Sequence, residues 1–123
     1  MVSLSPPAIE AFFAGEDGSP VVMLNLIRFD PDGGRERYLD YLQRAEPILA
    51  RFGANILFGG DGLPVLTTGQ AQGWDAVVLA HYPRRSAFRD MVADPDYQLV
   101  FKIGASAIAE IVLQPLKPMS ALM

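Results

Sequence analysis

The chain alternates between nearly continuous apolar runs and segments whose apolar residues recur at helical spacing. Residues 21–29 and 76–82 are apolar at almost every position, which predicts two strands covered on both faces. Residues 54–58 and 110–116 predict two further strands, with a turn at 59–62 and a hairpin return at 63–68. Pro83 is expected to end the strand at 76–82, because it has no N–H group for a ladder.

Helical spacing is clearest between the first two strands. Apolar residues there fall three and four positions apart from 38 to 52, and Gly53 is the expected stop. Phe88, Met91 and Val92 predict a short helix after Pro83, which ends at Asp94–Pro95. The sequence from residue 97 predicts a short turn. Residues 101–109 predict a helix that passes into coil.

The order of these elements predicts an α+β fold. Strand–helix–strand followed by strand–helix–strand is the ferredoxin-like split βαβ arrangement, with a mostly antiparallel sheet. In this arrangement the strands at 21–29 and 76–82 lie side by side in the centre, and the helices cover one face. Because both faces of these strands are apolar, the other face needs a cover. A second copy of the chain is the economical one, so we expect a homodimer.

Composition narrows the class of protein. The 123 residues suit one domain: a core at 19–118, an N-terminal helical extension at 1–18 and a tail at 119–123. Ser5 before Pro6 and Pro7 is the expected start of the extension's helix. No apolar run approaches the length of a membrane span, and a net charge of −4 argues against nucleic-acid binding. The start of the chain does not have the pattern of a signal peptide, so we expect a cytoplasmic protein.

Several motifs resemble those of one family. They are the run Asp17 to Phe29 (DGSPVVMLNLIRF), the helical AEPIL at 45–49, FGA at 52–54, WD at 74–75, YPRR at 82–85 and DPDYQ at 94–98. Together they resemble the domain of unknown function family 1330, within the dimeric α+β barrel superfamily. The resemblance implies a ferredoxin-like protomer and a homodimer whose two sheets enclose a cavity. It implies no single activity, since relatives include cofactor-free monooxygenases, lactone isomerases, haem enzymes and ligand-sensing domains.

Asn25 and His81 are the candidate catalytic residues. If the aliphatic even positions of the first strand face the helices, Asn25 points away from them, toward the cavity between the sheets. The small residues Ala76, Val78 and Ala80 suit helix packing, which would place His81 on the same face as Asn25. His81 could then exchange a proton near neutral pH. The alternatives are a structural Asn bonded to backbone and a partly exposed histidine at a strand end.

Four further residues are candidates for substrate binding. Arg28 could bind an acidic group at the cavity mouth, although a surface ion pair is an equal alternative. Asp75 would share the face of His81, and Tyr38 and Tyr82 could offer hydroxyl groups from the core. One histidine, scattered carboxylates and no cysteine do not make a metal site, and no cofactor motif is present. We therefore expect neither metal nor cofactor.

Two function classes remain open. The first is a small metal-free enzyme, an isomerase or a cofactor-independent monooxygenase, acting on a small organic acid or a ring substrate. The second is a non-catalytic homodimer that binds a small ligand or is purely structural. A cavity that brings Asn25, His81 and Arg28 together would favour the first class. A cavity filled by Met23, Ile27 and Leu79 would favour the second.

Overall fold

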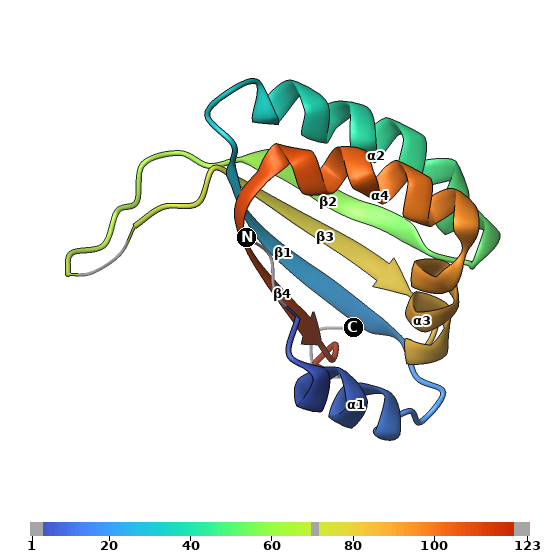
Figure 1. Ribbon diagram of the computed structural model, residues 1–123. Coiled ribbons are helices and arrows are strands. Elements are labelled where there is room, and N and C mark those ends of the chain that lie inside the picture. Colours follow the sequence, from blue (N-terminus) through green and yellow to red (C-terminus); the bar gives the residue numbers. More distant parts are fainter. Residues whose placement is uncertain (1–3, 70–71, 120–123) are drawn as a thin grey trace.

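A four-stranded sheet with helices along one face makes up the body of the protein (Figure 1). The computed structural model describes residues 4–69 and 72–119. In chain order the elements are α1 (Pro6–Ala14), β1 (Val21–Phe29), α2 (Gly34–Arg51), β2 (Asn55–Asp61), β3 (Ala76–Tyr82), α3 (Arg85–Ala93), α4 (Pro95–Ala107) and β4 (Ile108–Leu116). The expected C-terminal tail, apart from Met119, lies outside the described residues.

The sheet has the ferredoxin-like strand order. Its strands run β2-β3-β1-β4, and every neighbouring pair is antiparallel. The predicted α+β fold is therefore confirmed, with β1 and β3 in the centre as expected. In the register of these two strands Asn25 lies opposite Val78, and Val22 lies opposite His81.

Local sequence explains most element boundaries. β1 and β3 have the bounds that their apolar runs predict. Ser5 accepts a hydrogen bond from the Ala8 N–H and caps α1, and Gly53 adopts a left-handed φ of 74° just after α2. Pro115 lies in β4, which is an edge strand, where a missing N–H group is tolerated.

Three local predictions were wrong. Residues 59–61, expected as a turn, extend β2 because Gly59 and Gly60 pair with β3. Residues 63–68, expected as a returning strand, form no strand, since no neighbouring strand pairs with them. The expected short turn after Asp94 is the long helix α4. The Asp94 side chain caps it and Pro95 is its first residue, so the Asp–Pro pair ends one helix and starts the next.

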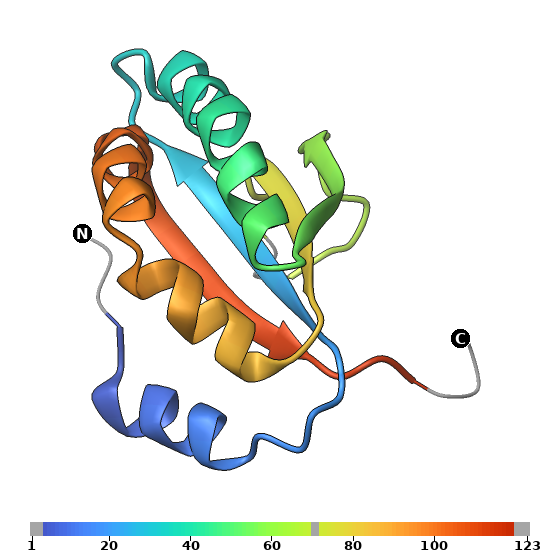
Figure 2. The same cartoon turned by 90° about the vertical axis from the view of Figure 1, so that its right-hand side faces the viewer.

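The two faces of the sheet have different surroundings. Helices α2, α3 and α4 gather on one side, as the turned view shows (Figure 2). Under them lie Val21, Met23 and Ile27 of β1 and the alternate residues of β3 from Ala76 to Tyr82, all buried. The opposite side we call the uncovered face. It carries Val22, Leu24, Leu26 and Arg28 of β1, Val77, Leu79 and His81 of β3, and Val112, Gln114 and Leu116 of β4.

Helix α1 is attached to α3 by hydrogen bonds and by packing of Phe12 and Phe13 against Phe88. Glu16, just after α1, accepts hydrogen bonds from the backbone N–H groups of Ser86 (2.8 Å) and Arg85 (3.2 Å) in the first turn of α3. Arg85 in turn donates to the Phe12 carbonyl (2.8 Å). Glu16 thus caps a helix that has no capping side chain of its own. Among the described residues, no helix is both long enough and apolar enough to cross a bilayer.

Candidate functional site

A cavity of about 610 Å³ lies between the sheet and the helices. Its walls are mostly aliphatic and aromatic side chains from all four strands and from α2, α3 and α4. The polar side chains that reach it are Asn25, Gln98 and the four tyrosines Tyr38, Tyr41, Tyr82 and Tyr97. Leu4, ahead of α1, also lines it. The volume falls in the range of small-molecule sites, roughly 300–1,000 Å³.

Asn25 presents a hydrogen-bond acceptor to this cavity. Its amide nitrogen donates to the backbone carbonyls of Met23 and Val78, each at 3.3 Å. Both partners are acceptors, so the nitrogen must face them and the orientation of the amide is fixed. The remaining oxygen, Oδ1, has no hydrogen-bond partner among residues 4–69 and 72–119, yet no side-chain N or O atom of these residues is both fully buried and unpaired. Oδ1 is therefore accessible to a molecule in the cavity.

Tyr41 of α2 and Tyr97 of α4 form a hydroxyl pair. Their Oη atoms lie 2.6 Å apart. Burial raises the pKa of Tyr41 well above its ordinary value, and the neighbouring Tyr97 raises it further. Burial also raises the pKa of Tyr97, against the smaller lowering effect of the Tyr41 hydrogen bond. Both hydroxyls are therefore neutral near pH 7 and can donate or accept hydrogen bonds, but neither is a ready base.

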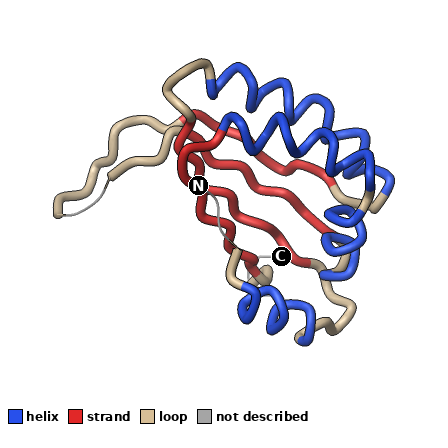
Figure 3. The backbone as a smooth tube through the Cα atoms, in the orientation of Figure 1, coloured by secondary structure: helices blue, strands red, loops and turns tan. Residues whose placement is uncertain are grey.

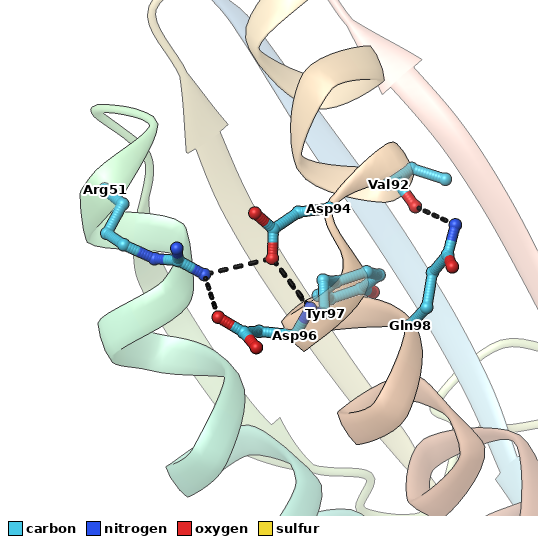
Figure 4. Close-up of polar contacts among 6 residues, drawn as sticks. All are labelled: Arg51, Val92, Asp94, Asp96, Tyr97 and Gln98. Atoms are coloured by element: carbon cyan, nitrogen blue, oxygen red, sulfur yellow. Dashed lines mark hydrogen bonds and ion pairs between the residues drawn. The ribbon is translucent and has the colours of Figure 1, made fainter.

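Tyr97 is positioned by the start of α4, which Figure 4 shows in detail. Asp94 accepts hydrogen bonds from the backbone N–H groups of Asp96 (2.9 Å) and Tyr97 (3.2 Å). Arg51, the last residue of α2, bridges Asp94 at 3.0 Å and Asp96 at 3.3 Å. Removal from water raises the pKa of Asp94, but the two N–H groups and Arg51 outweigh this and lower it. This cluster ties α4 to α2 on the side of the hydroxyl pair.

Among the described residues, the cavity lining carries no ionisable acid or base other than tyrosine. None of the lining residues is Asp, Glu, Lys, Arg or His. Within residues 4–69 and 72–119, no group of three or more His, Cys, Asp or Glu could hold a metal ion. What the site offers chemically is apolar contact with neutral hydrogen-bonding groups.

The prediction that Asn25 and His81 share a face was wrong. Asn25 lies opposite Val78 on the helix-covered side, whereas His81 lies opposite Val22 on the uncovered face. The wholly aliphatic positions of β1 are the ones turned away from the helices. Successive side chains of a strand point to opposite faces of the sheet. The prediction that the even positions face the helices therefore assigned every side chain of β1 to the wrong face. His81 therefore cannot contact a molecule held beside Asn25.

Arg28 and Asp75 hold the fold rather than line the cavity. Arg28 donates to Glu110 (2.5 Å) and to the Gly73 carbonyl (2.6 Å), and its guanidinium lies 4.2 Å from the centre of the Trp74 ring. Asp75 accepts a hydrogen bond from the Phe29 N–H group at 2.9 Å. Neither residue lines this helix-side cavity, and the predicted role of both in substrate binding stays a prediction.

The structure places two predicted tyrosines in the cavity and adds two more. Tyr38 and Tyr82 line it, and the Tyr82 hydroxyl donates to the sulfur of Met91 at 3.8 Å. Tyr41 and Tyr97, which the sequence analysis does not select as candidates, line it as well. Asp94–Pro95 is a helix-start signal, so the sequence could have predicted α4 as a helix. That prediction would have placed Tyr97 in the first turn of a helix that packs on the sheet.

Sequence comparison identifies the family. The family model "Domain of unknown function (DUF1330)" matches residues 33–113, about two-thirds of the chain. The chain belongs to the DUF1330 family. A search of curated proteins finds no match.

Solved structures agree with this fold. A protein of unknown function from Rhodopseudomonas palustris is 30% identical, with a TM-score of 0.85 and coverage of 97% of each chain. A dimeric ferredoxin-like protein of unknown function from Jannaschia sp. CCS1 is 12% identical over 81% of this DUF1330 chain and 100% of its own, with a TM-score of 0.61. SnoaB, a cofactor-independent oxygenase from Streptomyces nogalater, is 14% identical over 83% and 95%, with a TM-score of 0.57. At these low identities the last two share the fold alone.

Proposed function

We propose that this DUF1330 protein binds an uncharged ring compound bearing a hydroxyl group, in the cavity between its sheet and its helices. The observation that carries the proposal is the Oδ1 atom of Asn25, which meets no hydrogen-bond donor among the described residues, in a largely apolar cavity. A ligand O–H group would donate to this atom. The neutral hydroxyls of Tyr41 and Tyr97 offer the complementary partners for a ligand oxygen.

The lining favours a ring over an organic acid. A carboxylate in this cavity would lose its hydration and meet no cationic side chain of the described lining residues. Burying an unpaired charge is far more costly than burying a neutral hydroxyl that gains one hydrogen bond. Aromatic and aliphatic walls, by contrast, suit the faces of a ring system.

We also propose that the protein works as a homodimer through the uncovered face. Along β1 and β3 that face is aliphatic except for Arg28 and His81 near the strand ends, and a largely apolar surface is a typical association site. Two of the structures with this fold are described as dimeric ferredoxin-like proteins. Pairing two such faces would leave the helix-side cavity of each protomer free for a ligand.

Binding can be tested with a matched pair of naphthalenes. We expect 2-naphthol to bind with a one-to-one stoichiometry per chain in a fluorescence titration. We expect 2-naphthoate, of similar shape but charged, to bind at least about tenfold more weakly, a difference of about 1.4 kcal/mol. Equal affinity for the two compounds, or no binding of either at millimolar concentration, would refute the proposal. Analytical ultracentrifugation at micromolar concentration tests the dimer separately.

A second candidate is the cofactor-free oxygenation of a cyclic enol or phenol. The observation that favours it is the orientation of Asn25, whose amide oxygen could accept a hydrogen bond from the enol O–H group in an apolar cavity. In addition, SnoaB, which has the same fold, is described as a cofactor-independent oxygenase. The reaction would convert a ring CH₂ and O₂ into a carbonyl and water, so no further reductant is needed. Anthrone, which would give anthraquinone and water, is a suitable probe in an oxygen electrode. Oxygen uptake equal to that of buffer alone would exclude this activity for the probe.

A further inference from the structure

The connection between β2 and β3 projects from the protein with its apolar side chains exposed. We call residues 62–69 and 72–74 the β2–β3 arm. Figures 1 and 3 show it extending away from the sheet and helices. Leu66 is 99% exposed and Leu63 is 83% exposed, while Val65 is 44% exposed. Leucines this exposed gain nothing from their own chain, because they bury almost no apolar surface.

The base of the arm, unlike its leucines, is bound to the rest of the chain by hydrogen bonds and by packing. Gly62 donates its N–H group to the Asp75 carbonyl at 2.8 Å. Trp74 packs against the Arg28 guanidinium, which also binds the Gly73 carbonyl. Arg28 belongs to the uncovered face and pairs there with Glu110. The arm is therefore anchored at the end of the uncovered face, beside the Arg28–Glu110 ion pair.

We propose that the β2–β3 arm packs against a second copy of this chain and extends the dimer interface beyond the paired sheets. This inference rests on the proposed homodimer. Each copy supplies both an apolar face and an apolar arm, so a two-fold arrangement would cover two faces and two arms at once. Such self-complementarity is what an isologous contact requires.

The chemistry of the arm favours a second copy over other partners. Residues 63–68 read Leu-Pro-Val-Leu-Thr-Thr and carry no charge. A lipid surface with anionic headgroups would instead favour basic residues, and the chain has a net charge of −4. Phe58 of β2, opposite Leu79 and 57% exposed, extends the same apolar surface toward the arm.

The absence of cysteine allows a direct test. The chain has none, so Leu66→Cys introduces a single reactive thiol, and Leu99→Cys is the matched control. Leu99 is also exposed, at 64%, but lies on α4, on the helix side of the sheet. The measurement is the rate of alkylation by iodoacetamide at protein concentrations above and below the dimer dissociation constant. We expect Leu66→Cys to react at least about tenfold more slowly in the dimer, because burial removes thiol access. Leu99→Cys should react equally at both concentrations.

The outcomes separate this inference from the dimer itself. If the wild-type protein is a monomer at every concentration, the proposed dimer fails and the arm proposal fails with it. If a dimer forms but Leu66→Cys reacts at one rate throughout, only the arm proposal is overturned. A second variant, Leu63→Ser/Leu66→Ser, should raise the dimer dissociation constant at least about tenfold. It should leave the melting temperature of the dilute monomer unchanged, because neither leucine packs within its own chain.

Discussion

The hydroxyl oxygens of Tyr41 and Tyr97 lie 2.6 Å apart and join α2 to α4 beside the cavity. Removing one hydroxyl leaves the other without its protein partner in a largely apolar site. We therefore expect Tyr41→Phe and Tyr97→Phe each to lower the free energy of unfolding by about 1–3 kcal/mol. The double variant should lose less than the sum of the two, in a double-mutant cycle measured by urea unfolding. Tyr38→Phe is the control, since no hydrogen bond of its hydroxyl is found within the described residues.

Gly104 of α4 faces the ring of Tyr41 at close range. A Cβ atom there would lie 2.9 Å from the Tyr41 ring. Helix propensity alone predicts that Gly104→Ala stabilises by about 1 kcal/mol. We expect the opposite, a destabilisation of about 1–3 kcal/mol, because overpacking a buried contact outweighs propensity.

A second background checks this reason. In a Tyr41→Ala protein the obstructing ring is absent, so Gly104→Ala should there be neutral or stabilising in thermal unfolding. Destabilisation of equal size in both backgrounds would show that the Tyr41 contact is not the cause.

The tyrosines predict an unusual alkaline titration. Burial raises the pKa of all four tyrosines of the chain above the ordinary value of 10.0. The folded protein should therefore show almost no tyrosinate absorbance near 295 nm at a pH where unfolded chains, with a pKa of about 10, ionise. Stability linked to these groups is fully present below the unfolded pKa and is lost as the pH rises above it. An ordinary titration with the fold intact would contradict this.

Glu16 predicts an acid-sensitive N-terminal helix. The hydrogen bond from the Ser86 N–H group, with those of Gly18 and Arg85, lowers the pKa of Glu16 from 4.5 to about 2. A lowered pKa means that the contribution is present above 4.5 and is lost as the pH falls toward 2. Amide exchange in α1 should accelerate over this window. Glu16→Gln should weaken this pH dependence of amide exchange. Glu10 lies on the exposed side of α1, so Glu10→Gln should not change the dependence.

Much of the fold could be predicted from the sequence, but the faces of β1 could not. The apolar runs define β1 and β3, and helical spacing defines α2, because these signals are local. Which set of side chains on β1 meets the helices depends on its register with β3, and a shift of one residue inverts it. The prediction assumed that the most aliphatic set is the buried one. Instead, the helix-covered set includes Asn25, because that face encloses a cavity, and the aliphatic set lies on the uncovered face.

The candidate site was only partly predictable for the same reason. Tyr38 lies on the apolar stripe of α2, so its inward position follows from helical spacing. The pairing of Tyr41 with Tyr97 joins residues 56 positions apart and needs the tertiary structure. Arg28 could not be assigned because its partners, Glu110 and the Gly73 carbonyl, come from other parts of the chain.

The central claim is that Asn25 Oδ1 accepts a hydrogen bond from a neutral ligand in the cavity. Isothermal titration of wild type and Asn25→Leu with 2-naphthol and with naphthalene tests it most directly. Leucine keeps a side chain of similar size but removes the acceptor. We predict that Asn25→Leu weakens 2-naphthol binding at least about tenfold, or 1.4 kcal/mol, and leaves naphthalene binding within about threefold. Equal weakening of both ligands, or no weakening of 2-naphthol, would contradict the account.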